Sequence, residues 1–153
     1  MNKIIEIELN NINDLTEKYN KNIVSSNLLN YLIDRVFASK KSEHFNIIIH
    51  NNLNREDVVQ IIKEGIYVEY QKTLKNYKLT NIKQGLLIII GLLFLVLSSL
   101  VNEESIFKEL ILIAGWVPIW DAFDIELFSD TKQRRKLYAL KKLLNANYKV
   151  EKE

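Results

Sequence analysis

The chain has 153 residues with 21 Lys and Arg against 19 Asp and Glu, and its net charge of +2 indicates no polyanion partner by itself. It contains no cysteine, which excludes disulfides, thiolate metal sites and cysteine nucleophiles. One proline and four glycines argue against a loop-rich or all-β chain, and the length fits one domain or one small domain with an appendage.

Residues 1–80 are predicted to form a small cytoplasmic α/β domain. Residues 3–9 (KIIEIEL) alternate with the two-residue period of a half-buried strand, and residues 44–50 (HFNIIIH) form a second, more apolar strand. Residues 10–21 are polar and are expected to be irregular. Two strands joined through a helix favour a parallel pair with a right-handed crossover, so the expected order is β-α-β-α.

The two helices of this domain are predicted from their capping residues and apolar stripes. Ser25 or Ser26 caps the first helix, and Asn54 caps a second, longer helix in which a break is expected near Thr80. Two strands make a marginal sheet and about eighty residues make a marginal core. We therefore expect the domain to associate with another copy, for which an exposed strand edge is a natural place.

A transmembrane helix is predicted over residues 84–102, which carry no charged side chain. At about 1.5 Å per residue these nineteen residues reach about 28 Å, close to the hydrocarbon thickness of a bilayer. A soluble core helix is rarely apolar on every face over this length. The segment starts too far into the chain to be a signal peptide.

A second span is predicted over residues 106–126, joined to the first by a short outer loop at 102–105. Lys108 and Glu109 lie near its outer end, where long side chains can reach water. Trp116 and Trp120 are one turn apart and act as membrane-interface anchors, while Pro118 introduces a helix kink. Residues 84–128 then form a transmembrane helical hairpin.

Basic residues flank both predicted spans on the same side. Those before the first span are Lys72, Lys75, Lys78 and Lys83, and those after the second are Lys132, Arg134, Arg135, Lys136, Lys141 and Lys142. The connecting segment instead carries Glu103, Glu104 and Glu109 against Lys108. The positive-inside rule then predicts a two-pass protein of the bacterial inner membrane with both termini in the cytoplasm.

Residues 131–153 are predicted to form a basic cytoplasmic tail, helical from Thr131 to Tyr148. Three readings of this tail remain open: a helix on anionic lipid, a site for a nucleotide or nucleic acid, and a contact with the N-terminal domain. The candidate lipid or polyanion contacts are the six basic residues Lys132, Arg134, Arg135, Lys136, Lys141 and Lys142.

Asp121, Asp124 and Glu126 are the candidate pore or interface acids, because they lie at the cytoplasmic end of the second span. Asp121 and Asp124 are three residues apart and share one helix face. One interpretation places these acids among lipid headgroups, paired with basic residues nearby. The other places them in an acidic ring that selects cations at the mouth of an oligomeric pore, since carboxylates within a span are costly.

No catalytic motif is present: the chain lacks a glycine-rich nucleotide loop, a zinc-protease signature and a nucleophile elbow. The two histidines, His44 and His50, are six residues apart on one predicted strand and are too distant to share a metal. We therefore expect no enzyme activity, no metal and no cofactor.

The whole chain resembles a family of uncharacterised bacterial two-span inner-membrane proteins. The likeness rests on residues 85–95 (GLLIIIGLLFL), 113–120 (IAGWVPIW), 123–127 and 134–138. It implies an N-terminal β-α-β-α cytoplasmic domain followed by a glycine-led first span and a second span. A looser likeness of layout links the chain to pore-forming membrane effectors of antiphage systems that respond to nucleotide signals.

The expected fold is thus a membrane α-helical hairpin with a small cytoplasmic α/β domain. The leading functional hypothesis is a homo-oligomeric ion channel or membrane-perturbing effector in contact with anionic lipids and controlled through the cytoplasmic domain, by a soluble regulatory protein or a nucleotide-type ligand. The alternative is a non-conducting scaffold that recruits a soluble partner to the membrane.

Overall fold

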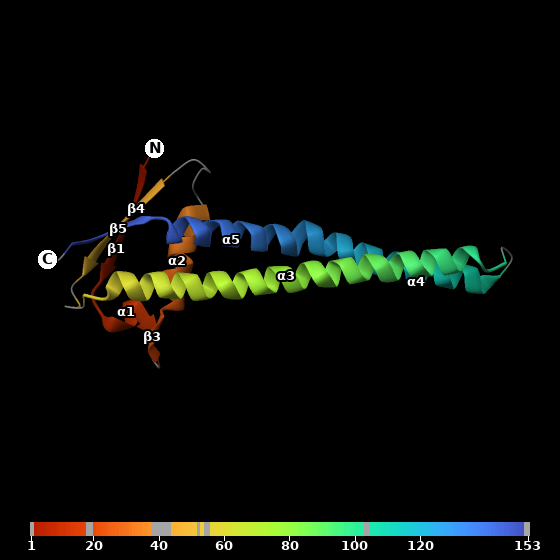
Figure 1. Ribbon diagram of the computed structural model, residues 1–153, viewed down its shortest axis with the longest axis horizontal. Coiled ribbons are helices and arrows are strands. Elements are labelled where there is room, and N and C mark those ends of the chain that lie inside the picture. Colours follow the sequence, from red (N-terminus) through yellow and green to blue (C-terminus); the bar gives the residue numbers. More distant parts are fainter. Residues whose placement is uncertain are drawn as a thin grey trace. The chain divides into compact units, whose positions relative to one another are not determined.

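The computed structural model describes residues 2–17, 20–37, 44–51, 53, 56–102 and 105–151 (Figure 1). The chain is mostly helical and divides into two compact units. The first, here called the α/β domain, combines Met1–Thr73 with Arg135–Glu153. The second, here called the hairpin unit, is Leu74–Arg134. The predicted tail therefore groups with the N-terminal domain, so the domain is built from both ends of the chain.

A parallel sheet of three strands forms the base of the α/β domain. Its strands are β1 (Asn2–Leu9), β4 (His44–Asn51) and β5 (Asn147–Glu151), in the order β1-β4-β5. The parallel pairing of β1 with β4 through α2 (Ser26–Phe37) was expected. The third strand was not expected: the tail helix α5 (Thr131–Leu144) ends four residues before Tyr148, and β5 follows it.

The segment expected to be irregular contains short regular elements. A one-turn helix α1 (Ile12–Leu15) precedes an antiparallel pair, β2 (Thr16–Glu17) and β3 (Asn20–Val24). Asp14 caps the start of this helix: its Oδ2 accepts a hydrogen bond from the Asn11 amide at 2.8 Å. These polar capping contacts explain why a segment without apolar periodicity is still ordered.

The core of the α/β domain lies on one face of the sheet. Alternate strand residues point into it, among them Ile5 and Ile7 of β1 and Ile47 and Ile49 of β4, because side chains alternate across a strand. The helices contribute their apolar stripes, which are Leu28, Leu32, Ile33 and Val36 of α2, Val58, Ile62 and Ile66 of α3 (Val58–Ser99), and Ala139, Leu140 and Leu143 of α5. The apolar face of α5 is therefore used inside the domain rather than on lipid.

Helix α3 runs without interruption from the α/β domain into the hairpin unit. The break expected near Thr80 is absent, since α3 is continuous through this position, where the Thr80 hydroxyl donates to the Asn76 carbonyl at 2.9 Å. At the other end the predicted cap Asn54 lies outside the described residues. The first turn is instead closed on Asp57, whose carbonyl accepts from the Ile61 amide at 3.0 Å.

The hairpin unit consists of the second part of α3, helix α4 (Ile106–Asp124) and a π-helical segment η1 (Ile125–Asp130), which leads into α5. Among the described residues, α3 is the one helix long and apolar enough, by length and composition, to cross a membrane. Only 11% of its most apolar window is buried, unlike the core helix of a soluble protein. The expected second span corresponds to α4, and its crossing of a membrane stays a prediction.

Two glycines bring the helices of the hairpin close together. A Cβ atom on Gly91 of α3 would lie 2.7 Å from the Gly115 carbonyl oxygen of α4, and one on Gly115 would lie 3.1 Å from the Gly91 carbonyl oxygen. No larger residue fits this crossing without a shift of the helices. Gly85, by contrast, has open space around it. The loop acids Glu103 and Glu104 lie outside the described residues.

Candidate functional site

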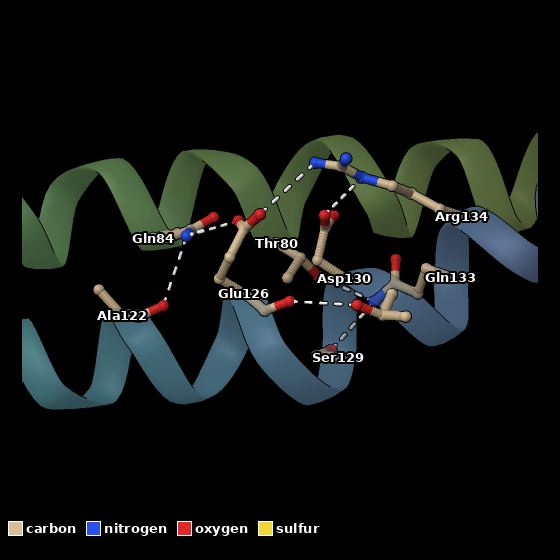
Figure 2. Close-up of polar contacts among 9 residues, drawn as sticks. Thr80, Gln84, Ala122, Glu126, Ser129, Asp130, Gln133 and Arg134 are labelled. Carbon is tan, nitrogen blue, oxygen red and sulfur yellow. Dashed lines mark hydrogen bonds and ion pairs between the residues drawn. The ribbon is translucent and has the colours of Figure 1, made fainter.

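A group of polar side chains joins α3 to the returning chain at the end of the hairpin opposite its loop (Figure 2). We call it the polar cluster, and its members are Thr80, Gln84, Glu126, Ser129, Asp130, Gln133 and Arg134. On α3, Thr80 and Gln84 follow Tyr77 at helical spacing, so the three share one face. All members belong to the hairpin unit.

Gln84 connects α3 to the last turn of α4 and the start of η1. Its Nε2 donates to Glu126 Oε2 at 2.9 Å and to the Ala122 carbonyl at 3.3 Å. The carboxylate of Glu126 also lies 3.7 Å from the Arg134 guanidinium. Gln84 therefore lies level with residues 122–126, and one of the three predicted acids, Glu126, is compensated inside the hairpin unit.

Asp130 is a buried carboxylate held by one arginine. Its side chain is 2% exposed, and its Oδ2 accepts from Arg134 Nε at 2.6 Å, while the Arg134 side chain is 60% exposed. A hydrogen bond to the Tyr77 hydroxyl and then the Asp130 charge raise the pKa of Arg134 further above its ordinary value, so the guanidinium stays charged. The guanidinium carbon of Arg134 lies 5.9 Å from the centre of the Tyr77 ring.

Gln133 links α3 to η1. Its Nε2 donates to Thr80 Oγ1 at 3.2 Å and to Ser129 Oγ at 3.3 Å. Asp130 Oδ1 and Gln133 Oε1 are buried and accept no hydrogen bond from the described residues. A buried carboxylate with one unsatisfied oxygen depends on its remaining partner, so Arg134 is the main electrostatic support of Asp130.

The π-helical turn η1 is what keeps the polar residues facing α3. In an α-helix, residues four positions apart are rotated by about 40° beyond one full turn. In an unbroken α-helix from Ala122, contact residues at every fourth position would therefore move steadily around the helix axis and away from α3. The wider π turn at Ile125–Asp130 takes up this drift. Ala122, Glu126, Asp130 and Arg134 therefore follow one another on the side that meets α3 (Figure 2).

The other two predicted acids lie outside this cluster. Asp121 and Asp124 are exposed in the last turn of α4, and neither has an ion-pair partner among the residues that the structure describes. Of the three acids, Glu126 has a basic neighbour in Arg134, as the interpretation with paired acids proposes. Two carboxylates thus remain exposed at the level of Gln84.

The predicted interface anchors are exposed on α4. Trp116 and Trp120 are both largely accessible, and the Trp120 ring lies 6.4 Å from that of Phe123. Helix α4 continues through Pro118 to Asp124.

Half of the basic residues predicted to contact lipid or a polyanion are used within the chain. Lys136 Nζ pairs with Glu69 at 2.6 Å, Arg134 holds Asp130, and Lys142 lies over the rings of Phe45 and Tyr138 at 5.3 and 5.1 Å. The others, Lys132, Arg135 and Lys141, are exposed. The tail therefore makes the contact with the N-terminal domain that was one of its three expected roles.

The polar cluster was not predicted as a site. Glu126 and Arg134 were candidate site residues separately, and a further signal is the spacing of Tyr77, Thr80 and Gln84, which places polar residues on one face just before an apolar run. Asp130 and Gln133 carried no signal, because in a basic helix they look like ordinary solvated side chains.

The contacts within the polar cluster are hydrogen bonds and ion pairs. Among the described residues, no three His, Asp or Glu side chains are grouped to hold a metal ion. His50 of β4 lies 3.9 Å from Glu151 of β5, within the α/β domain. Comparison of the chain with known protein families, characterised proteins and solved structures found no match.

Proposed function

We propose that this chain is an integral membrane protein in which α3, from about Gln84, and α4 cross the bilayer as a hairpin. The proposal is supported by large apolar side chains that are exposed on both helices. They include Leu86, Ile89, Leu93, Val96, Leu110, Ile113, Val117 and Trp120. Exposed apolar surface of this extent is typical of contact with lipid or with other subunits. The flanking lysines and arginines favour a cytoplasmic location for both ends.

Several copies then assemble into a channel or membrane-perturbing effector. The observation that carries this step is the exposure of Asp121 and Asp124, which have no ion-pair partner among the described residues at the inner end of the hairpin. A carboxylate exposed there is stabilised by water in a path or by groups of another copy. The close crossing of Gly91 and Gly115 leaves no water path inside one hairpin, so any path lies between copies.

Control by the α/β domain is supported by the connectivity of the chain. The hairpin is inserted between β4 and β5, two neighbouring strands of one sheet. Helix α3 carries core residues of the domain, such as Ile62, and continues as the first helix of the hairpin. Binding that changes the helices of the domain therefore acts directly on helices of the hairpin.

The experiment is cation flux from liposomes containing the purified full-length chain. The double variant Asp121→Asn and Asp124→Asn is expected to lower the ratio of cation to anion permeability without altering insertion. Glu109→Gln, at the other end of α4, is the matched control and is expected to leave the ratio unchanged. Unchanged selectivity in the double variant contradicts the acidic mouth, and tight liposomes with the wild-type chain favour the non-conducting scaffold.

The resemblance to two-span inner-membrane proteins and to antiphage effectors extends the proposal to a biological role. It predicts that triggered protein collapses the membrane potential of the cell. Cells expressing the chain would then show dye-reported depolarisation on phage infection, and the Gly91→Leu variant, which cannot close the hairpin, would not.

A further inference from the structure

The sheet of the α/β domain has two outer strands with the same direction. Among the described residues, β1 and β5 each pair with β4 on one side only, and all pairings are parallel. The unpaired N–H and C=O groups of an outer strand are a template for another strand. One chain therefore offers two complementary edges that can continue the same sheet.

The β1 edge is open to an incoming strand. A groove of about 820 Å³ lies along it, lined by six consecutive residues of β1 from Lys3 to Glu8 and by Asp14. The wall is formed by α2 through Leu28, Tyr31 and Arg35. A groove lined by consecutive residues of one strand follows the strand edge itself, and its length suits a strand of five or six residues.

The charged side chains of the two edges lie on the same face of the sheet: the β1 edge carries Glu6 and Glu8, whereas the β5 edge carries Lys149 and Glu151, which pair with each other at 2.8 Å within one chain and can exchange partners. Glu6 of β1 and Lys149 of β5 both pair in register with Ile48 of β4, so their side chains lie on one face, and Lys149 is 74% exposed. Glu6 and Glu8 are exposed on this face at the β1 edge. A strand with a lysine between two apolar residues complements this edge, and β5 has that pattern in Tyr148, Lys149 and Val150.

We infer that β5 of one copy adds in parallel to β1 of the next copy, so that the sheet continues from subunit to subunit. The inference rests on the proposed membrane function, because copies held in one membrane share their orientation and so present strands of equal direction. The favoured register places Lys149 beside Glu8 and Asn147 beside Glu6, so that Glu151 lies opposite Asn10 and not directly opposite a glutamate. Such a head-to-tail interface closes into a ring when the rotation between copies allows it.

The absence of native cysteine makes the pairing directly testable. The double variant Glu8→Cys and Lys149→Cys is prepared in the full-length chain, reconstituted in lipid nanodiscs and mildly oxidised. Neighbouring strands lie about 4.8 Å apart, within the range that a disulfide bridges. The expected result is a ladder of covalently linked chains on reducing-agent-free gels. Gln71→Cys with Lys149→Cys, whose Gln71 is exposed on α3 away from the sheet, is the control and should give no ladder.

Charge-reversal variants are the second test of the strand pairing. Lys149→Glu is expected to weaken the oligomer, and adding Glu8→Lys is expected to restore it, with native mass in nanodiscs as the readout. A discrete oligomer of wild-type chains with no ladder in the cysteine variant overturns the strand pairing but leaves the proposed channel intact. A monomer in the native mass measurement overturns both the pairing and the channel.

Discussion

Helices α4 and α5 are separated only by η1, yet the same kinds of apolar side chain are exposed on α4 and buried on α5. Leu110 and Ile113 of α4 are 57% and 59% exposed, whereas Leu140 and Leu143 of α5 are fully buried in the α/β domain. Leucine and isoleucine occur in both, so composition does not decide their environment. The difference lies in pattern: α4 is apolar around its whole circumference, while α5 has one apolar stripe and a basic remainder.

The comparison teaches that the α/β domain has a core of its own and the hairpin unit does not. In water the domain stabilises itself by removing its stripe from solvent, at about 25 cal/mol per Å² of apolar surface. The hairpin has little such gain within one chain, so its apolar surface requires lipid or another copy. The same substitution should therefore have different effects in the two helices.

The largest expected effect comes from truncating a buried leucine of α5. Leu143→Ala should lower the free energy of unfolding of the α/β domain by about 2–5 kcal/mol, because Leu143 is fully buried. Leu110→Ala on α4 is the matched change at an exposed position and should cost less than about 0.5 kcal/mol. Thermal unfolding in micelles, followed by circular dichroism, measures both. Equal losses would refute the contrast between the two helices.

The next effect concerns the crossing of the hairpin. Gly91→Ala places a methyl group against the Ile119 side chain and the Gly115 carbonyl, and should destabilise the hairpin by about 1–3 kcal/mol. Gly85→Ala has free space and should stabilise α3 by up to about 1 kcal/mol through helix propensity. Titration with a denaturing detergent measures the helical content of each variant. A neutral Gly91→Ala would show that the helices do not cross there.

A third prediction tests the buried carboxylate of the polar cluster. Arg134→Gln leaves the buried carboxylate of Asp130 without its guanidinium partner and should measurably destabilise the hairpin unit. Adding Asp130→Asn should recover part of that loss, because the uncompensated charge is removed. The control is Arg135→Gln, an exposed neighbour with an expected effect within about 0.5 kcal/mol. Additive losses in the double variant would contradict the pairing.

The smallest effect is a pH dependence in the α/β domain. Burial raises the pKa of Tyr148 far above its ordinary value of 10.0, and its hydroxyl donates to the Leu143 carbonyl at 2.9 Å. Above pH 10 the unfolded chain loses this proton while the folded chain keeps it. Stability should therefore fall as pH rises, by at most about 1.4 kcal/mol per pH unit. Denaturant titrations between pH 9 and 11 should show a shallower slope for Tyr148→Phe.

Much of the α/β domain was predictable, because its strands and helix α2 show clear periodicity. Strand β5 was not, since residues 147–151 (NYKVE) are mostly exposed and show no clear run of buried apolar residues, although they pair in parallel with β4. The helix that precedes it was predicted, and its contact with the N-terminal domain was one of three open roles, which the sequence alone did not separate. Periodicity reports that a face is buried and does not report what buries it.

The polar cluster was less predictable than the fold. Gln84 and Glu126 are 42 residues apart, and no local pattern links them. The register that brings Asp130 to α3 depends on one π-helical turn, which has no recognised sequence signature. The exposed acids Asp121 and Asp124 were identified because a charge near an apolar run is conspicuous, whereas a glutamine or a buried aspartate is not.

The insertion of the hairpin between β4 and β5 has a consequence for the order of events during synthesis. The ribosome makes β1, α2 and β4 first, but Ala139, Leu140 and Leu143 of the core, together with β5, emerge only after both helices of the hairpin. The sheet is therefore completed only after both helices of the hairpin have been synthesised, and until then the apolar residues of β1, α2 and β4 lack the cover that α5 supplies.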